Sequence, residues 1–305
     1  MVTTESVIQF PSAWISSNSF ERALFRATAA PHSNKAHIVR ILVPTGCNLM
    51  VDSGAKLLSL TNQLCHAMKA VTIEFEDGES GTMGYLNRMG LFDMLDATVK
   101  VLPARPAMSG AQLYRGGNRN LVEFKALRRG GADKELPASL ADSLHNAAPK
   151  TTANRTLGDT AYTIFSEIIG NVYRHSSTPL DGCAALQYYP NGKKVTVCVS
   201  DSGYGIMDTL RPTLRKHFPA LVDKSDTHLL IEMVSKGLSR FGRDNGCGIR
   251  QCAVKALSLN ASLEIRMPTS RVVFKRKSER LNLALYEAEL PLLWGTHICL
   301  DFQLD

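Results

Sequence analysis

The feature that most restricts how this chain can fold is a mixed polar and apolar pattern in residues 158–176. Glu167, Asn171 and His175 are four residues apart, which places them within an arc of about 80° on one face of a helix. An apolar stripe runs beside them, formed by Ala161, Ile164, Ile168 and Val172. Polar groups at the border of a buried stripe need hydrogen-bond partners. We therefore expect a helix that holds three polar side chains next to its core; a charged edge facing solvent is the alternative.

A second pattern places a carboxylate at the end of an apolar strand. Residues 195–200 read VTVCVS, Asp201 follows at once, and Gly203 and Gly205 come next. A carboxylate can accept a hydrogen bond from the amino group of adenine, and glycine lets backbone lie close to a flat base. A simple turn after a strand would give the same pattern, so the pattern alone is weak evidence for an adenine site.

Two further glycine patterns follow along the chain. Gly246 and Gly248 stand where a glycine-rich loop runs into a helix, and helix N-termini are natural phosphate sites. A flexible surface loop with cap glycines is the alternative. Gly295 and Thr296 precede the last expected strand, and the Thr296 hydroxyl could reach a base through water. The pattern of a phosphate-binding P-loop is absent from the chain.

The first half of the chain alternates between strand and helix patterns. We expect strands at 37–43 and 71–75 and helices at 54–69 and 80–95, the first helix capped by Asp52 or Ser53. A strand, a helix and a strand in succession imply a parallel pair with a crossover helix. Residues 103–120 are expected to form a loop. A second cluster of breaking residues at 130–137 marks the expected domain boundary, which gives an α/β domain at 1–135 and a second domain at 136–305.

The second half predicts hairpin-linked strands with helices set apart from them. Residues 184–189 and 194–200 flank the turn sequence PNGK, and a further strand pair is expected at 262–276, then a linker, then a last strand at 296–303. Helices are expected at 138–148, at 158–176 and from Gly248. We expect an α+β sandwich, with the helices on one face of a mixed sheet.

Taken in order, these patterns resemble the ATP-binding Bergerat fold of the gyrase, heat-shock chaperone, histidine-kinase and MutL (GHKL) superfamily. The resemblance implies that Asn171 holds Mg²⁺ against the phosphates of ATP and that Glu167 activates water or an acceptor. It implies that Asp201 binds adenine above Gly203 and Gly205 and that His175, Gly246, Gly248 and Thr296 complete the site. Residues 207–245 would form a mobile lid.

The first half resembles, more loosely, the STAS-like domains of some bacterial proteins, through the stretch VTIEFEDGESGTMGYLNRMGLFDML at 71–95. The two resemblances together imply an ATP-dependent signalling switch with slow hydrolysis, acting on a protein partner or as a homodimer. Three alternatives stay open: a serine/threonine kinase of the anti-sigma-factor type acting on a STAS partner, a module that binds ATP without turnover, and nucleic-acid processing. An autokinase using His145 is less favoured, because its surroundings lack the acidic and proline-bounded pattern of such histidines.

Bulk composition adds the setting. The net charge of +7 suits an acidic ligand, nucleotide included, but aromatics are not interleaved with the basic clusters as a base-stacking platform requires. No apolar run is long enough to span a bilayer, and the first thirty residues lack a secretory signal pattern. The 7 cysteines are scattered and odd in number, which indicates free thiols in a reducing cytoplasm.

Overall fold

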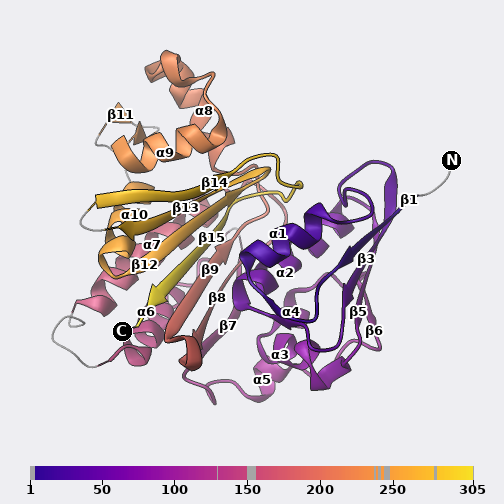
Figure 1. The fold of residues 1–305 in the computed structure, drawn as a ribbon. Helices are drawn as coiled ribbons and strands as arrows, with labels where there is room; N and C mark the ends of the chain where they lie inside the picture. Colours follow the sequence, from indigo (N-terminus) through magenta and orange to yellow (C-terminus); the bar gives the residue numbers. More distant parts are fainter. Residues whose placement is uncertain are drawn as a thin grey trace.

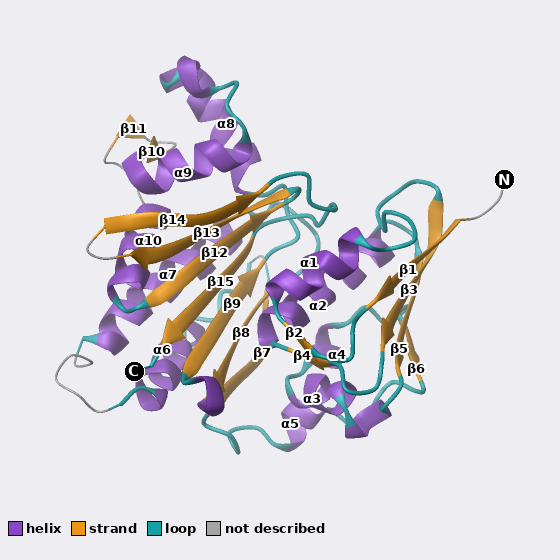
Figure 2. Ribbon diagram, in the orientation of Figure 1, coloured by secondary structure: helices purple, strands orange, loops and turns teal. Residues whose placement is uncertain are grey.

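Two β-sheets of different kind organise the molecule, with helices between and around them (Figure 2). The computed structural model describes residues 4–128, 130–149, 156–236, 238–239, 242–243, 248–277 and 280–304. One sheet is parallel and belongs to the first half of the chain, and the other is antiparallel. The protein is therefore a mixed α/β structure.

The parallel sheet confirms the crossover that the first half predicted. Its strands, in spatial order, are β1 (Thr4–Gln9), β3 (Ala36–Val43), β5 (Ala70–Phe75) and β6 (Lys100–Leu102). A short pair, β2 (Trp14–Ile15) and β4 (Asn48–Leu49), lies outside this sheet. The helices of this half are α1 (Ser17–Phe25), α2 (Val51–His66), α3 (Thr82–Arg88), α4 (Leu91–Met94) and α5 (Gly110–Leu113), with a 3-10 turn η1 (Gly78–Ser80).

The large sheet has seven strands, and each neighbouring pair is antiparallel, which corrects the expectation of a mixed sheet. The last strand, β15 (His297–Gln303), lies in the interior of this sheet, between β12 (Ala261–Met267) and β9 (Lys194–Ser200). The strand of this sheet that comes first in the sequence, β7 (Leu121–Leu127), precedes residue 135 yet pairs with β8 (Gly182–Tyr189). In spatial order the strands are β14 (Arg280–Glu287), β13 (Ser270–Lys277), β12 (Ala261–Met267), β15 (His297–Gln303), β9 (Lys194–Ser200), β8 (Gly182–Tyr189) and β7 (Leu121–Leu127).

Helices cover both faces of the large sheet, and not one face as expected. Figure 1 shows α1 and α2 between the two sheets, with the later helices on the far side of the large one. Those later elements are α6 (Leu136–Ala147), α7 (Leu157–His175), α8 (Ile206–His217), α9 (Asp226–Lys236) and α10 (Gly248–Ser258), the 3-10 turns η3 (Pro190–Gly192) and η4 (Pro219–Leu221), and a small pair, β10 (Leu238–Ser239) with β11 (Gly242–Arg243).

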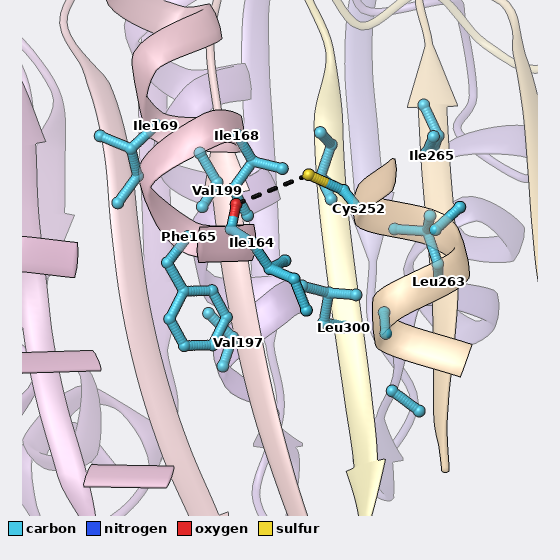
Figure 3. Close-up of a cluster of buried hydrophobic side chains, with 14 of the residues drawn as sticks. Ile164, Phe165, Ile168, Ile169, Val197, Val199, Cys252, Leu263, Ile265 and Leu300 are labelled. Atoms are coloured by element: carbon cyan, nitrogen blue, oxygen red, sulfur yellow. Dashed lines mark hydrogen bonds between the residues drawn. The ribbon is translucent and has the colours of Figure 1, made fainter. Parts of the chain in front are cut away.

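The apolar stripe of α7 is buried against the large sheet, as its sequence predicted. Ile164 and Ile168 are 0% and 2% exposed, and Figure 3 shows them facing side chains of β9, β12, β15 and α10. Strand β9 alternates between two cores: Val197 and Val199 pack on the α7 side, whereas Cys198 packs on the side of α2. This explains why VTVCVS is apolar at nearly every position, since a strand covered on both faces has no solvent side.

Four local expectations are corrected. Helix α2 begins at Val51 after Met50, and Asp52 accepts a hydrogen bond from the backbone of Ser17 at 2.9 Å instead of capping its own helix. The helix expected at 80–95 is divided into α3 and α4, because Gly90 has a φ of +80°. The expected loop at 103–120 contains α5, and the expected linker after residue 276 contains β14.

The segment 207–245, expected as a mobile lid, contains most of α8, then η4, α9 and the pair β10 and β11. Arg211 on α8 bridges to Asp226 at the start of α9, with a 2.5 Å contact between Nη2 and Oδ1. Leu229, Leu230 and Val234 of α9 are buried in the main core. Helix α9 is thus a packed element of the fold.

A layer of buried charges joins α1 and α2 to the large sheet. Glu21 of α1 contacts Lys56 of α2 and Arg266 of β12, each at 3.1 Å. Lys56 also contacts Glu264 of β12 at 3.0 Å. The charges alternate in sign, so each buried ion has a partner.

The six cysteines in the described part of the chain are free thiols, and Cys65 is the one that is half-buried while the other five are buried. Cys247 lies outside the described residues. Within the described ranges, no helix is both long and apolar enough to cross a membrane.

Candidate functional site

Asp201 lies where two neighbouring strands of the large sheet end together. Ser200 of β9 pairs with His297 of β15, so Asp201 comes to stand beside Thr296, and its backbone N–H donates to the Thr296 carbonyl at 3.0 Å. The Asp201 carboxylate accepts a hydrogen bond from the backbone N–H of Gly203 at 2.8 Å, and the backbone of Thr296 also acts to lower its pKa. Asp201 is 7% exposed.

Burial sets the protonation of this carboxyl. Desolvation raises the pKa of Asp201 to about 6, although the two backbone donors act to lower it. Among the described residues, no cation forms an ion pair with this carboxylate, and its hydrogen bond comes from a backbone amide. A buried carboxylate held only by amides can still accept further hydrogen bonds, because an ionised carboxyl group offers about four acceptor positions. This is the property that an adenine-binding acid requires.

Glycines bring three chain segments into contact around Asp201. A Cβ atom at Gly203 would lie 1.7 Å from the carbonyl oxygen of Ser176, the C-cap residue of α7. A Cβ at Gly295 would lie 2.0 Å from the Asp201 carbonyl oxygen. Gly205 has a φ of +86°, and after it the N–H of Ile206 donates to the Thr296 hydroxyl at 3.0 Å. The loop, the end of α7 and the start of β15 therefore form one cluster.

The polar face of α7 meets the N-terminus of α10. A Cβ at Gly248, the first residue of α10, would lie 2.0 Å from Oε1 of Glu167. Arg174 joins the face: its Nη2 donates to Oδ1 of Asn171 at 3.0 Å and to Oε1 of Glu167 at 3.3 Å. A carboxylate at a helix N-terminus is favourable, because the free N–H groups there carry partial positive charge.

The structure thus gathers the expected site residues into two neighbouring groups that share α7. Asp201, Gly203, Gly205 and Thr296 meet at its C-terminal end, while Glu167, Asn171 and Gly248 meet along its length. His175 is the last residue of α7, but its side chain is outside the described part, and so is Gly246. The Thr296 hydroxyl accepts a hydrogen bond from the backbone N–H of Ile206 at 3.0 Å.

The sequence interpretation missed Arg174 and Ser202. Arg174 lies three residues after Asn171, a spacing that brings side chains together on a helix, so the pattern could have revealed it. Ser202 is 4% exposed and accepts a hydrogen bond from Gln63 of α2 at 2.9 Å. No local pattern could have revealed that contact, because the two residues are 139 positions apart.

Among the described residues, no group of three or more histidine, cysteine or acidic side chains is placed to hold a metal ion. Two oxygen-bearing side chains of α7, the Asn171 amide and the Glu167 carboxylate, both accept hydrogen bonds from Arg174. Such a pair fits Mg²⁺ only as it is bound with nucleotides, where phosphates and water supply the other ligands.

The fold and the site together define a mixed α/β protein with a polar cluster at one end of a seven-stranded antiparallel sheet. No protein-family model matches the chain, and the searches of curated proteins and of solved structures likewise give no match.

Proposed function

We propose that this chain is an ATP-binding regulatory protein, a nucleotide-dependent switch of the GHKL kind with slow hydrolysis of Mg-ATP. The single observation that carries the proposal is the meeting of Asp201, at the end of β9, with the end of α7 through the close contact of Gly203 and Ser176. The two halves of the expected pocket come from segments that are not adjacent in sequence, and this contact joins them.

The chemistry of each group supports the same use. The buried Asp201 carboxylate would accept a hydrogen bond from the amino group of adenine. At the other group, the N-terminus of α10 and the guanidinium of Arg174 provide positive charge for phosphates. Asn171 would ligate Mg²⁺, which neutralises phosphate charge when bound.

Hydrolysis would need a base, and Glu167 is the candidate. A water oxygen would attack the γ-phosphorus, the bond to the bridging oxygen of ADP would break, and Glu167 would take the proton that the water loses. Closure and reopening then follow from the difference in affinity between two conformations, since a ligand shifts an equilibrium by that difference alone.

Calorimetric titration with ATP and Mg²⁺ tests binding, with Asp201→Asn as the deciding variant. The asparagine oxygen can still accept from Gly203, so the loop keeps its shape. Its amide group, however, would face the adenine amino group donor to donor. We expect measurable ATP affinity in the unsubstituted protein and at least a tenfold loss in Asp201→Asn, about 1.4 kcal/mol. Equal ATP affinity of the two proteins would show that Asp201 does not bind the nucleotide.

Turnover is tested separately with Glu167→Gln. This variant should keep ATP binding but lower phosphate release by roughly a hundredfold, the usual scale for loss of a general base. Asp159→Asn is the matched control, because Asp159 is an exposed acid in the first turn of the same helix. If Glu167→Gln and Asp159→Asn release phosphate at equal rates, Glu167 is not the base.

The same site would serve two alternative functions. A serine/threonine kinase of the anti-sigma-factor type, acting on a STAS-domain partner, would transfer label from γ-labelled ATP to protein. A non-hydrolysing module would show ATP-dependent thermal stabilisation without phosphate release. Labelled ATP followed by gel analysis therefore separates turnover, transfer and simple binding in one experiment.

A further inference from the structure

The side chain of Gln63 links the first half of the chain to the candidate nucleotide site. Gln63 lies on α2 and is fully buried. Its Nε2 donates to the Ser202 hydroxyl at 2.9 Å and to the Trp294 carbonyl at 3.0 Å, and its Oε1 accepts from the Trp294 backbone N–H at 2.9 Å. The amide thus pairs with the peptide of Trp294 in both directions, as a neighbouring strand would.

These contacts fix the orientation of the amide without ambiguity. The N–H of Trp294 can only donate and its carbonyl can only accept, so the oxygen and nitrogen of Gln63 can face them in one arrangement only. With both N–H groups and the oxygen engaged, the side chain has one low-energy position. A buried amide satisfied in this way specifies a single local structure.

The two segments that Gln63 holds are the two that form the Asp201 group. Ser202 directly follows Asp201, and Trp294 directly precedes Gly295 and Thr296. The backbone N–H of Asp201 donates to the carbonyl of Thr296 at 3.0 Å. Gln63 therefore sets the separation between the loop that carries the acid and the strand that begins beside it.

The surroundings of Trp294 come from the first half as well. The rings of His32 and His66 lie 5.0 Å and 6.3 Å from the Trp294 ring, centroid to centroid. Nε2 of His297 contacts the Trp294 carbonyl at 3.0 Å. Trp294 is half-buried and contacts groups from both halves, so its position depends on how α2 lies against the large sheet.

We infer that Gln63 is a positioning residue through which α2 controls the affinity of the Asp201 site for adenine nucleotides. The inference rests on the proposed function for its ligand. Displacement of α2 would separate the two segments and weaken nucleotide binding. By thermodynamic reciprocity, nucleotide binding would hold α2 in place by the same factor. A partner that docks on the first half could then regulate the nucleotide site without touching it.

The experiment compares Gln63→Met with Asn62→Leu in the full chain. Asn62 is the adjacent residue of α2, and its amide also makes two backbone bonds, to the Met94 carbonyl at 3.0 Å and from the Asp96 N–H at 2.9 Å. Those bonds point away from the Asp201 group. Both variants lose a bonded amide, so a merely structural role would give similar effects in both.

Two measurements are expected to distinguish Gln63→Met from Asn62→Leu. Calorimetry should give an ATP affinity about tenfold weaker in Gln63→Met, within the usual range of coupling between sites, and unchanged in Asn62→Leu. Carbon-13 NMR of the aspartate carboxyls, with Asp201 assigned from the Asp201→Asn spectrum, should show the pKa of Asp201 falling in Gln63→Met as water enters. The pKa of Asp201 should be unchanged in Asn62→Leu.

Either readout left unchanged in Gln63→Met, or changed equally in both variants, overturns the inference. If the unsubstituted protein binds no ATP, the proposed function fails, and the titration of Asp201 alone decides the role of Gln63. Should Gln63→Met fail to fold, Gln63→Glu takes its place, because it keeps the acceptor for Trp294 and loses both donated bonds.

Discussion

The ionised carboxylate of Asp201 lowers the stability of the fold, although it belongs to the candidate site. This carboxylate is buried beside backbone donors, and desolvation raises its pKa to about 6 from the usual value of 3.8. A raised carboxyl pKa means that the ionised form opposes folding above pH 6, and that the opposition fades as the pH falls through this range. Groups of this kind are typical of binding and active sites.

We therefore expect Asp201→Asn to stabilise the ligand-free protein at pH 8. The shift of roughly two pKa units corresponds to a gain of up to about 3 kcal/mol in the free energy of unfolding. Chemical denaturation at pH 8 and pH 5 measures it, and the gain should shrink at the lower pH. A variant less stable than the original at pH 8 would show that the carboxylate contributes to folding instead.

His297 predicts the opposite dependence on pH. It is 3% exposed, and its pKa is lowered to about 3, chiefly by burial and then by Arg266 and Lys56. A histidine that stays neutral when folded stabilises the protein above its unfolded pKa of about 6.5 and loses that contribution as the pH falls.

His297→Gln should remove this loss of stability at low pH. The glutamine amide can still donate to the Trp294 carbonyl. Between pH 7 and pH 5 the original protein should lose about 2 kcal/mol more than the variant. Denaturant titrations at the two pH values provide the comparison. Parallel pH profiles would mean that His297 does not carry the acid sensitivity.

At the scale of elements, the sequence predicted what depends on local periodicity. The stripe of α7, the hairpin of β8 and β9, and the parallel strands β3 and β5 were all indicated by neighbouring residues. The sequence predicts a linker where β14 lies, because RLNLALYE follows a charged stretch. The sequence does not predict that α2 covers the large sheet, because no local pattern in either segment indicates a contact with the other.

The buried charges of α1 form another arrangement that local pattern could not predict. Burial acts to raise the pKa of Glu21, but Lys56 and Arg266 more than offset it, so the pKa falls to about 2. The contribution of Glu21 to stability is accordingly present above pH 4.5 and is lost as the pH falls toward 2.

Glu21→Gln should destabilise the protein by about 3–5 kcal/mol at pH 7, because Lys56 and Arg266 would keep their charges in a buried setting. Thermal or chemical unfolding measures the effect. Arg22→Gln is the control on the same helix, since Arg22 is exposed and, among the described side chains, donates a hydrogen bond only to Ser19, at 3.3 Å. Equal stability of the two variants would contradict the assigned role of the cluster.

At the scale of the whole molecule, the two halves share one sheet. Cys183, Ala185 and Cys198 of β8 and β9 belong to the same apolar core as Leu58 of α2. The core of the first half therefore extends onto strands from the second half.

A fragment of residues 136–305 should consequently fail to form a stable native fold. It would lack strand β7, and it would expose the sheet face that α2 covers. Size-exclusion chromatography and near-ultraviolet circular dichroism of the fragment, beside the full chain, would test this. A monomeric fragment with native-like tertiary signals would show that the second half folds without the first.

The place of β15 in the large sheet has a consequence for how the sheet closes. This strand lies between β12 and β9, which both precede it in the chain. Without β15, the sheet is two separate ribbons with open edges, and open edges invite pairing with other chains. The core can therefore close only once β15 is in place, and loss of this strand would leave the two ribbons unjoined.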